Sequence, residues 1–233
     1  MSSTRKAAAL IGILFILATV TGVIAAVLLT PILNAPDYLS QIAAHEGQVI
    51  LSAFLTFIMA MCCAGIGLAL FPILNKFNEG LAAGSAGFRL IEAMIQVLSA
   101  LLMACLLIVG RSAVSAADPS AVSFQAIGDV LKAANDWLTN SPMLICWGIG
   151  ALMYYFAFYR YRLLPRWLSL WGLIAMTLTI VVSVLVMLEL IPGFGTFQTA
   201  ANMPIALQEM VLAVWLIVKG FNSPTKTSMP GSI

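Results

Sequence analysis

The sequence predicts an all-α protein that crosses a membrane six times, because of its composition, its hydropathy and the placement of its charges. Hydrophobic residues make up 62% of the 233 residues and charged residues only 9%. Soluble domains average about half apolar and a quarter charged residues. The mean hydropathy is +1.04. This composition excludes a water-soluble globule, a nucleic-acid-binding domain and a disordered chain. At ~20 apolar residues for each crossing, the chain can supply about six or seven helices.

Six long apolar stretches supply the predicted membrane-spanning helices. None alternates apolar and polar residues as barrel strands do, so each is expected to satisfy its own backbone hydrogen bonds as a helix. The first is too long for the apolar core of a signal peptide and lacks a small-residue cleavage site, so we interpret it as a retained helix. The predicted spans are Ala7–Leu29, Val49–Leu74, Leu81–Val109, Met143–Tyr159, Trp167–Leu188 and Met203–Val218.

Two of the connections have helical character of their own. Pro36–Gln48 carries a helix-start signal and apolar residues at helical spacing, which predicts a short amphipathic helix on the outer surface. Ser115–Asn140 has the same pattern, with Asp118-Pro119 as its start signal, and we expect it to behave similarly. The last segment, 222–233, is polar and contains two prolines, which predicts a disordered cytoplasmic tail after a single domain of residues 1–221.

The distribution of Lys and Arg predicts that both termini lie in the cytoplasm. With that orientation the inner segments hold eight of the eleven basic residues, and the outer segments hold only Arg111 and Lys132. Such a bias is typical of cytoplasmic loops. The eight inner residues are Arg5, Lys6, Lys76, Arg160, Arg162, Arg166, Lys219 and Lys226. An inner interfacial belt is expected from Tyr154, Tyr155, Tyr159, Tyr161, Trp167 and Trp171.

Three charged residues and a neighbouring glutamine inside the predicted spans are the candidate site residues. Arg89, Glu92 and Gln96 occur at i, i+3 and i+7, which places them on one face of the third helix. At 1.5 Å per residue from the cytoplasmic boundary, Arg89 is ~13 Å deep and Glu92 ~18 Å deep. Glu209 in the sixth helix is ~15 Å deep by the same count. In a hydrocarbon core of ~30 Å, these three charged residues lie near the midplane.

Buried charges at this depth are expected to face the bundle interior and to pair. Each costs ~2.5–3.5 kcal/mol on the insertion scale, and arginine stays charged. We predict that Arg89 lies within salt-bridging distance of Glu209, which leaves Glu92 as the additional carboxyl group. Either one glutamate is then protonated, or a cation, water or polar ligand compensates it. The alternative is that the Arg89–Glu209 pair only locks the third helix to the sixth.

His45 and Glu46 form a second group of polar candidates, at the outer start of the second span. A single histidine excludes bis-histidine haem ligation and the HExxH zinc motif, and we predict neither a metal site nor a cofactor. GxSxG, P-loop and GxGxxG motifs do not occur in the sequence, so no catalytic residue is assigned. The four cysteines lie within apolar spans, where we expect them to act as small hydrophobic residues.

Four segments together resemble one bacterial membrane family, the domain-of-unknown-function 4386 family. They are AAHEGQ (Ala43–Gln48), FRLIEA (Phe88–Ala93), YRYRLLPRWLSLWG (Tyr159–Gly172) and QEMVLAVWLIVKGF (Gln208–Phe221). The resemblance extends from the first helix to Phe221 and implies a small multi-helix protein of the inner membrane. The family has no assigned activity, so no catalytic role is carried over. The resemblance also implies that the recurring polar positions of the family correspond to His45, Glu46, Arg89, Glu92 and Glu209.

Three functions remain open from the sequence. The first is a carrier or ligand-binding protein that uses Arg89, Glu92 and Glu209 to bind a small solute or a proton. Six helices then permit a 3+3 inverted repeat, and the small size favours a homodimer. The second is a membrane-embedded enzyme on a lipid or prenyl substrate, with one glutamate as general acid or base. The third is an accessory subunit whose buried charges contact another chain of a membrane complex.

Overall fold

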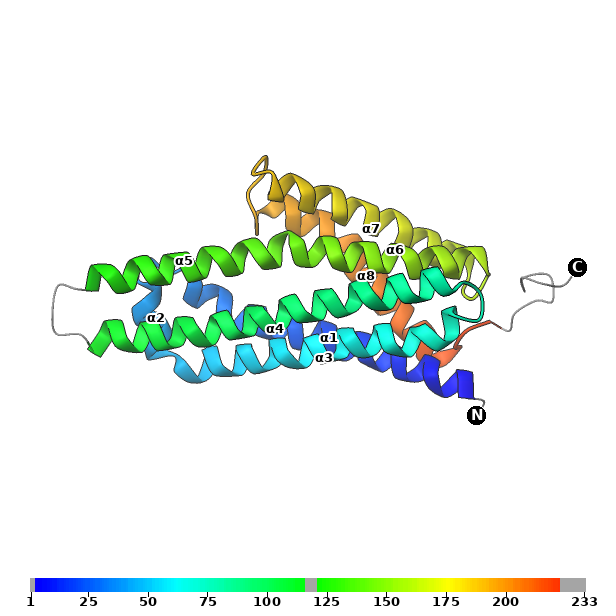
Figure 1. Ribbon diagram of the computed structural model, residues 1–233, viewed down its shortest axis with the longest axis horizontal. Helices are drawn as coiled ribbons and strands as arrows, with labels where there is room; N and C mark the ends of the chain where they lie inside the picture. Colours follow the sequence, from blue (N-terminus) through cyan, green and yellow to red (C-terminus); the bar gives the residue numbers. More distant parts are fainter. Residues whose placement is uncertain (1–2, 116–120, 223–233) are drawn as a thin grey trace, which may run out of the picture.

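Long helices lie side by side along the length of the protein (Figure 1). The computed structural model describes residues 3–115 and 121–222. The order of the helices is α1 (Ser3–Leu33), α2 (Tyr38–Ala44), α3 (Glu46–Leu74), α4 (Glu79–Ser115), α5 (Ala121–Asn140), α6 (Pro142–Arg160), α7 (Arg166–Met187) and α8 (Thr196–Val218). The described residues contain no strand. The predicted all-α class is therefore confirmed.

Six helical segments are long and apolar enough to cross a membrane, so the protein is a multi-pass membrane protein. Five of them are α1, α3, α4, α7 and α8, and the sixth runs through α5 and α6 from Ser123 to Arg160. Each predicted span except that ending at Leu188 lies inside an observed helix, and α7 ends one residue earlier. The helix α8 begins well before the predicted Met203 because its polar first turns are held by the bundle. There Gln198 donates a hydrogen bond to the carbonyl of Asn140 at 3.0 Å.

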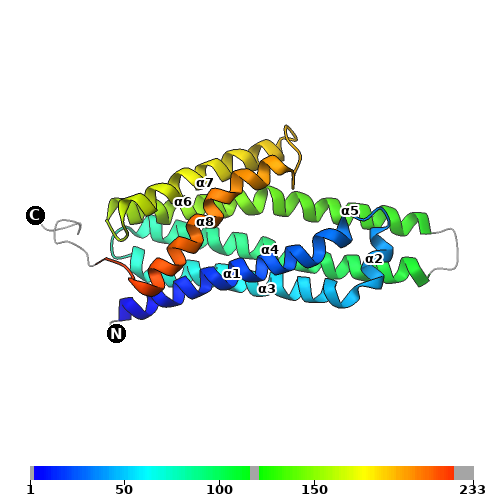
Figure 2. The same cartoon turned by 180° about the vertical axis from the view of Figure 1, so that it is seen from behind.

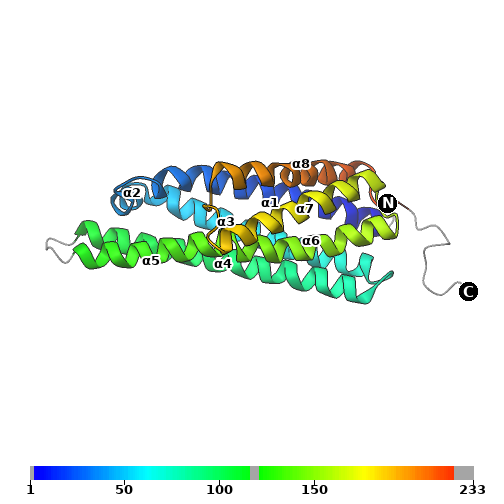
Figure 3. The ribbon, with the colours of Figure 1, turned by 90° about the horizontal axis from the view of Figure 1, so that it is seen from above.

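The helix α4 is longer than a membrane is thick. Its 37 residues extend over ~55 Å at 1.5 Å per residue, against a hydrocarbon core of ~30 Å. The C-terminal part of α4 packs against α2 and α5, far from the two ends of the described chain (Figure 3). We call the region where the C-terminal part of α4 packs against α2 and α5 the distal lobe. Its apolar core is formed by Ile32, Leu33, Tyr38, Leu39, Ile42, Val49, Met103, Leu106 and Leu107.

The predicted surface helix of Ser115–Asn140 is a helix, but its placement on the membrane surface is wrong. The observed α5 runs antiparallel along α4 and is followed at once by α6 (Figures 1 and 3). The reason is that the long α4 offers α5 an apolar surface. The start signal Asp118-Pro119 lies outside the described residues.

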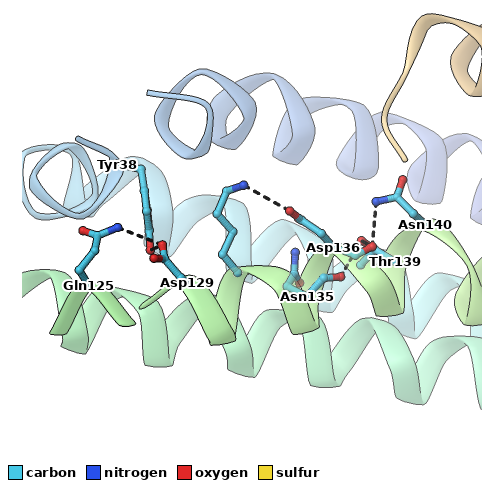
Figure 4. A network of polar contacts seen from close by, with 8 residues as sticks. Tyr38, Gln125, Asp129, Asn135, Asp136, Thr139 and Asn140 are labelled. Carbon is cyan, nitrogen blue, oxygen red and sulfur yellow. Dashed lines mark hydrogen bonds and ion pairs between the residues drawn. The ribbon is translucent and has the colours of Figure 1, made fainter. Parts of the chain in front are cut away.

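The helix predicted within Pro36–Gln48 is present as α2, and its placement on the outer surface stays a prediction. Its Tyr38, Leu39 and Ile42 are buried in the distal lobe. The Tyr38 hydroxyl donates to Asp129 of α5 at 2.7 Å, as Figure 4 shows. Burial, together with this hydrogen bond and the charge of Asp129, raises the pKa of Tyr38 above its ordinary value. These contacts join α2 to α5.

The start of α1 and the end of α8 lie at the same end of the bundle (Figure 2). The guanidinium of Arg5 donates to the carbonyls of Leu216 at 3.1 Å, of Ile217 at 2.6 Å and of Val218 at 2.6 Å. The last turn of a helix leaves its carbonyls without partners inside the helix, so Arg5 caps α8. Six crossings return the chain to the side on which it started, which agrees with the two ends lying at the same end of the bundle. The cytoplasmic orientation and the inverted repeat stay predictions, and the predicted tail from residue 223 onward lies outside the described residues.

The predicted interfacial belt is only partly right. Tyr154 and Tyr155 are 0% exposed and belong to the core, where their rings lie 4.5 Å apart. Both project from the side of α6 that faces other helices, and a Cβ at Gly172 of α7 would lie only 2.5 Å from the Tyr155 ring. In contrast, Trp167 is exposed, and the Lys219 ammonium lies 4.4 Å from the Trp215 ring centroid. The two tyrosines were predicted to be interfacial because they lie near basic residues in the sequence, but they lie on the inward side of α6.

The predicted orientation can be tested with single cysteines in a variant whose four native cysteines are replaced by alanine. Cysteines replacing the exposed Asn78 and Arg162 should react with a membrane-impermeant maleimide from the cytoplasmic side, and one replacing Phe194 from the outside. The excess of basic residues on one side is the reason. A cysteine at Met94, which is 70% exposed on a membrane-spanning helix, is the unreactive control. Labelling of Arg162→Cys from the outside would reverse the arrangement.

Candidate functional site

Three polar side chains of α4 are buried in the middle of the bundle, as their spacing predicts. Arg89 is 2% exposed, Glu92 3% and Gln96 1%. They lie on the face of α4 that packs against α3 and α6. The remaining faces of α4 carry exposed apolar residues such as Met94 and Leu101. The polar face of α4 is therefore turned into the protein, and the apolar face is available to lipid.

The ion pair of Arg89 is made with Glu92 and not with Glu209. Arg89 Nη1 lies 2.9 Å from Glu92 Oε2. The predicted Arg89–Glu209 pair is wrong because matching depth does not fix the direction in which two side chains point. Side chains on a helix lean toward its N-terminus, so Glu92 leans back toward Arg89 one turn earlier. The buried pair is thus formed within α4.

Two glycines bring neighbouring helices close to Arg89. A Cβ at Gly67 of α3 would lie 2.8 Å from Arg89 Cβ, and one at Gly150 of α6 would lie 3.4 Å from the Arg89 backbone nitrogen. The backbone carbonyl of Cys63 accepts a hydrogen bond from Arg89 Nε at 3.4 Å. Neither glycine was predicted to contact Arg89, although small residues are common where membrane helices touch.

Gln96 extends the network one turn further along α4. Its Nε2 donates to Glu92 Oε1 at 3.1 Å and to Cys63 Sγ at 3.6 Å. The buried Gln96 Oε1 has no hydrogen-bond partner. An ionised carboxylate only accepts hydrogen bonds, so the amide group must turn its nitrogen toward Glu92. The oxygen of Gln96 is therefore left as a buried acceptor.

Glu209 of α8 is the second buried carboxyl group. It is 9% exposed, and its Oε1 has no hydrogen-bond partner. Arg89 lies near enough to interact with it electrostatically, and the Tyr154 hydroxyl and the Trp147 indole are its polar neighbours. One cation therefore faces two carboxyl groups. The structure moves the additional carboxyl group from Glu92, where the sequence analysis placed it, to Glu209.

A second polar connection joins α6, α7 and α8 beside Glu209. The Tyr155 hydroxyl donates to Gln208 Oε1 at 2.5 Å, and Gln208 Nε2 donates to the Leu168 carbonyl at 3.1 Å. Gln208 was not among the residues predicted from the sequence. A glutamine next to Glu209 in an apolar span was the available signal, because polar side chains within a membrane need partners.

A cavity of about 560 Å³ extends from Gln96 toward the distal lobe. It is lined mainly by α1, α3, α4 and α5, and Met143 of α6, Thr199 of α8 and the exposed Phe194 of the α7–α8 connection also border it. The polar lining includes Ser52, Thr56, Ser99, Lys132, Asn135, Asp136 and Thr139. The buried network on α4 thus borders a space that other helices line with polar groups.

His45 and Glu46 lie far along α3 from this network and form a different arrangement. Glu46 accepts two hydrogen bonds from the Arg111 guanidinium, both at 2.7 Å, which joins the start of α3 to the end of α4. His45 Nδ1 lies 3.0 Å from the Gln41 carbonyl oxygen. The described residues contain no group of three His, Cys, Asp or Glu side chains that could hold a metal ion. Glu46 and His45 therefore make local contacts and are not part of the network on α4.

The four cysteines are unpaired thiols in the described structure. Cys62 and Cys63 are buried, whereas Cys105 and Cys146 are half-buried. Cys63 is more than a small hydrophobic residue, because its thiol and its carbonyl both contact the polar network of α4.

Comparison with known proteins identifies the family and nothing closer. No curated protein and no solved structure matches the chain significantly. The family described as Domain of unknown function (DUF4386) matches residues 10–220. Because this match covers nearly the whole sequence, including every residue of the network on α4 and Glu209, the multi-pass membrane protein belongs to the DUF4386 family.

Proposed function

We propose that the protein binds a small solute or a proton at Arg89, Glu92, Gln96 and Glu209 and carries it across the bacterial inner membrane. The observation that carries the proposal is the unpartnered Oε1 of the buried Glu209, beside an arginine already paired with Glu92. An ionisable residue within a membrane is expensive, and such residues commonly mark ion or substrate pathways. A carboxyl group without its own cation can be neutralised by a proton or by a ligand.

The surroundings of Glu209 suit a group that gains and loses a proton. The neighbouring Tyr154 hydroxyl and Trp147 indole are hydrogen-bond donors that can stabilise the carboxylate form. Burial among apolar side chains favours the neutral form. On the other side of the network, Gln96 is one of the residues that line a cavity among α1, α3, α4 and α5. Sites near the midplane that are reached from one side at a time are typical of transporters.

The oligomeric state is part of the same proposal. Six crossings make a small carrier, and a homodimer would bring two such bundles together. Exposed apolar residues on α4, among them Met94 and Leu101, offer a surface that could meet lipid or a second copy. Measuring the mass of the purified protein in lipid nanodiscs would distinguish a monomer from a dimer.

The test of the proposed function is the substitution Glu209→Gln, with Glu189→Gln as its matched control. Glu189 is an exposed glutamate in the α7–α8 connection, so its substitution should change nothing. In the wild type, infrared difference spectroscopy between acidic and neutral pH should show a buried carboxyl group that gains a proton on acidification. Glu209→Gln should remove this signal, and in proteoliposomes with a pH-sensitive dye inside it should abolish proton uptake.

The same substitution should leave the melting temperature nearly unchanged, because glutamine resembles the protonated acid and Arg89 keeps its partner. If Glu209→Gln retains the wild-type infrared signal and the wild-type proton uptake, the proposed function is wrong. A strong loss of melting temperature would instead identify Glu209 as a structural partner of Arg89.

A further inference from the structure

The outward face of α8 carries a hollow near the C-terminal end of the helix. The hollow has a volume of about 440 Å³ and is lined by Met210, Val211, Val214, Trp215, Val218 and Lys219. Their spacing of three to four residues places them on one face of α8. Val214 is 55% exposed and Val218 64%, so the hollow opens toward the surrounding lipid and not toward the packed core.

The length of the hollow matches one leaflet of a bilayer. Met210 and Lys219 are nine residues apart along α8, which is ~14 Å at 1.5 Å per residue. Half of a hydrocarbon core of ~30 Å is ~15 Å. A membrane-spanning helix of a partner would lie along both leaflets, whereas an acyl chain of a phospholipid lies in one. The dimensions therefore favour a lipid chain over a helix.

A cation stands at the end of this apolar hollow. Among the described residues that line it, Lys219 alone is charged. The Lys219 ammonium lies 4.4 Å from the centroid of the Trp215 ring, and the Trp167 ring packs edge-on against Trp215 at 6.4 Å. In the described part of the chain no carboxylate forms a salt bridge with Lys219. Tryptophans are typical of the membrane interface, which is where a lipid head group lies.

The same end of the bundle is strongly basic. Arg5 contacts the last turn of α8, and Asn222 donates to the Arg162 carbonyl at 3.1 Å, so the start of α1 and the α6–α7 connection meet here (Figure 2). The rings of Phe77 and Tyr161 stack at 4.9 Å and bring in the α3–α4 connection. Against one acidic residue, Glu79, the described parts of these segments carry Arg5, Lys6, Lys76, Arg160, Arg162, Arg166 and Lys219. This end therefore attracts molecules with a net negative charge.

We propose that the hollow on α8 binds an anionic phospholipid, with one acyl chain along Val211, Val214 and Val218 and the phosphate beside the Lys219 ammonium. Lysine binds phosphate as a compact point charge. A zwitterionic phospholipid also has a phosphate, but the basic end repels its ammonium group. The leaflet concerned is the predicted cytoplasmic one. The site goes beyond the proposed function, because neither the network on α4 nor Glu209 lines the hollow.

The test measures lipid binding by native mass spectrometry of the full-length protein released from detergent micelles. The probes are phosphatidylglycerol and phosphatidylcholine with identical oleoyl chains, each titrated separately. We expect phosphatidylglycerol to bind the wild type about fivefold more tightly, which is the usual effect of one basic residue near anionic lipid. Lys219→Gln should remove this preference. Lys76→Gln removes an exposed charge at the same end but outside the hollow, so it should retain the preference.

A second pair of variants tests the position of the acyl chain. Val214→Trp fills the hollow with a bulky side chain, and it should weaken the binding of both phospholipids. Val181→Trp places the same side chain at a 51% exposed position of α7 outside the hollow, and it should leave binding unchanged. Glycerol 3-phosphate carries the anionic group without the chains, so it should not displace phosphatidylglycerol from the wild type.

Each contrary result overturns the proposal. Equal binding of the two phospholipids to the wild type would refute the claim about charge, and equal losses in Lys219→Gln and Lys76→Gln would show that the basic end as a whole attracts the anion. Unchanged binding in Val214→Trp would exclude the hollow as the site of the chain.

The same spectra exclude other occupants of the hollow. Displacement by glycerol 3-phosphate would mean that the site takes a free phosphate. A wild-type dimer that becomes monomeric in Val214→Trp would identify a second copy of the chain as the occupant. None of these results alters the infrared signal of Glu209, so failure of this proposal is distinguishable from failure of the proposed function.

Discussion

Arg89→Met is expected to destabilise the protein by about 3–5 kcal/mol, which is the range for breaking a buried ion pair by removing one partner. Methionine fills much of the same space, so the main loss is electrostatic. Glu92 remains 3% exposed and loses the cation 2.9 Å away. The loss is measured as a fall in the melting temperature and in the denaturant midpoint of the protein in nanodiscs.

Two further variants show whether the charge pair is responsible. In the double variant Arg89→Met, Glu92→Met no buried charge is left unpaired between these positions, so most of the lost stability should return. Arg111→Met breaks the pair with Glu46, whose side chains are 50% and 39% exposed, and it should leave the melting temperature nearly unchanged because water already screens these charges. A double variant as unstable as Arg89→Met would contradict the interpretation, since packing would then explain the loss.

Gly67→Ala is expected to destabilise the protein by about 1–3 kcal/mol, the usual cost of overfilling a packed interior. The new methyl group would lie 2.8 Å from Arg89 Cβ and 3.4 Å from Ala86 Cα, so α3 and α4 must move apart. The movement would also weaken the hydrogen bond from Arg89 to the Cys63 carbonyl. Thermal unfolding measures the loss of stability, and the reactivity of Cys63 toward a thiol reagent should rise.

The matched control is Gly87→Ala, at a glycine of α4 whose added Cβ would meet nothing within 4 Å. Alanine favours a helix over glycine by about 1 kcal/mol, so this substitution should be neutral or stabilising. Opposite signs for the two substitutions would attribute the effect of Gly67 to close packing. A loss of equal size at both positions would instead point to a general intolerance of alanine in these helices.

The sequence was sufficient to predict the spans and the burial of Arg89, Glu92 and Gln96 on one face of a helix, whereas their depth in the membrane stays a prediction. A continuous apolar stretch specifies a membrane helix, and a rise of 1.5 Å per residue then gives the depth of each side chain. Depth alone does not give the partner. Arg89 and Glu209 were assigned to matching depths, yet Arg89 pairs with Glu92 because the direction of a side chain depends on how the helices are rotated and packed.

Sequence patterns could not predict the distal lobe or the cavity, for a related reason. An amphipathic pattern such as that of α5 states that one face needs an apolar partner, but lipid head groups and another helix satisfy it equally well. Because α4 presents an apolar surface, α5 packs against α4 and does not lie among the lipid head groups. The cavity is lined by residues of α1 and α5 among others, and no local signal in the sequence reveals that these two helices border the same space.

The contact between Arg5 and the last turn of α8 also has a consequence for biogenesis. The helix α1 is synthesised before α8, so the carbonyls that Arg5 caps do not exist until the rest of the bundle has been made. Until then the face of α1 around Gly12, where a Cβ would lie 2.6 Å from the Ala213 carbonyl oxygen, must be exposed to lipid or to another protein. Docking of α8 on α1 is therefore the event that closes the bundle, and it completes assembly only after α8 has been inserted.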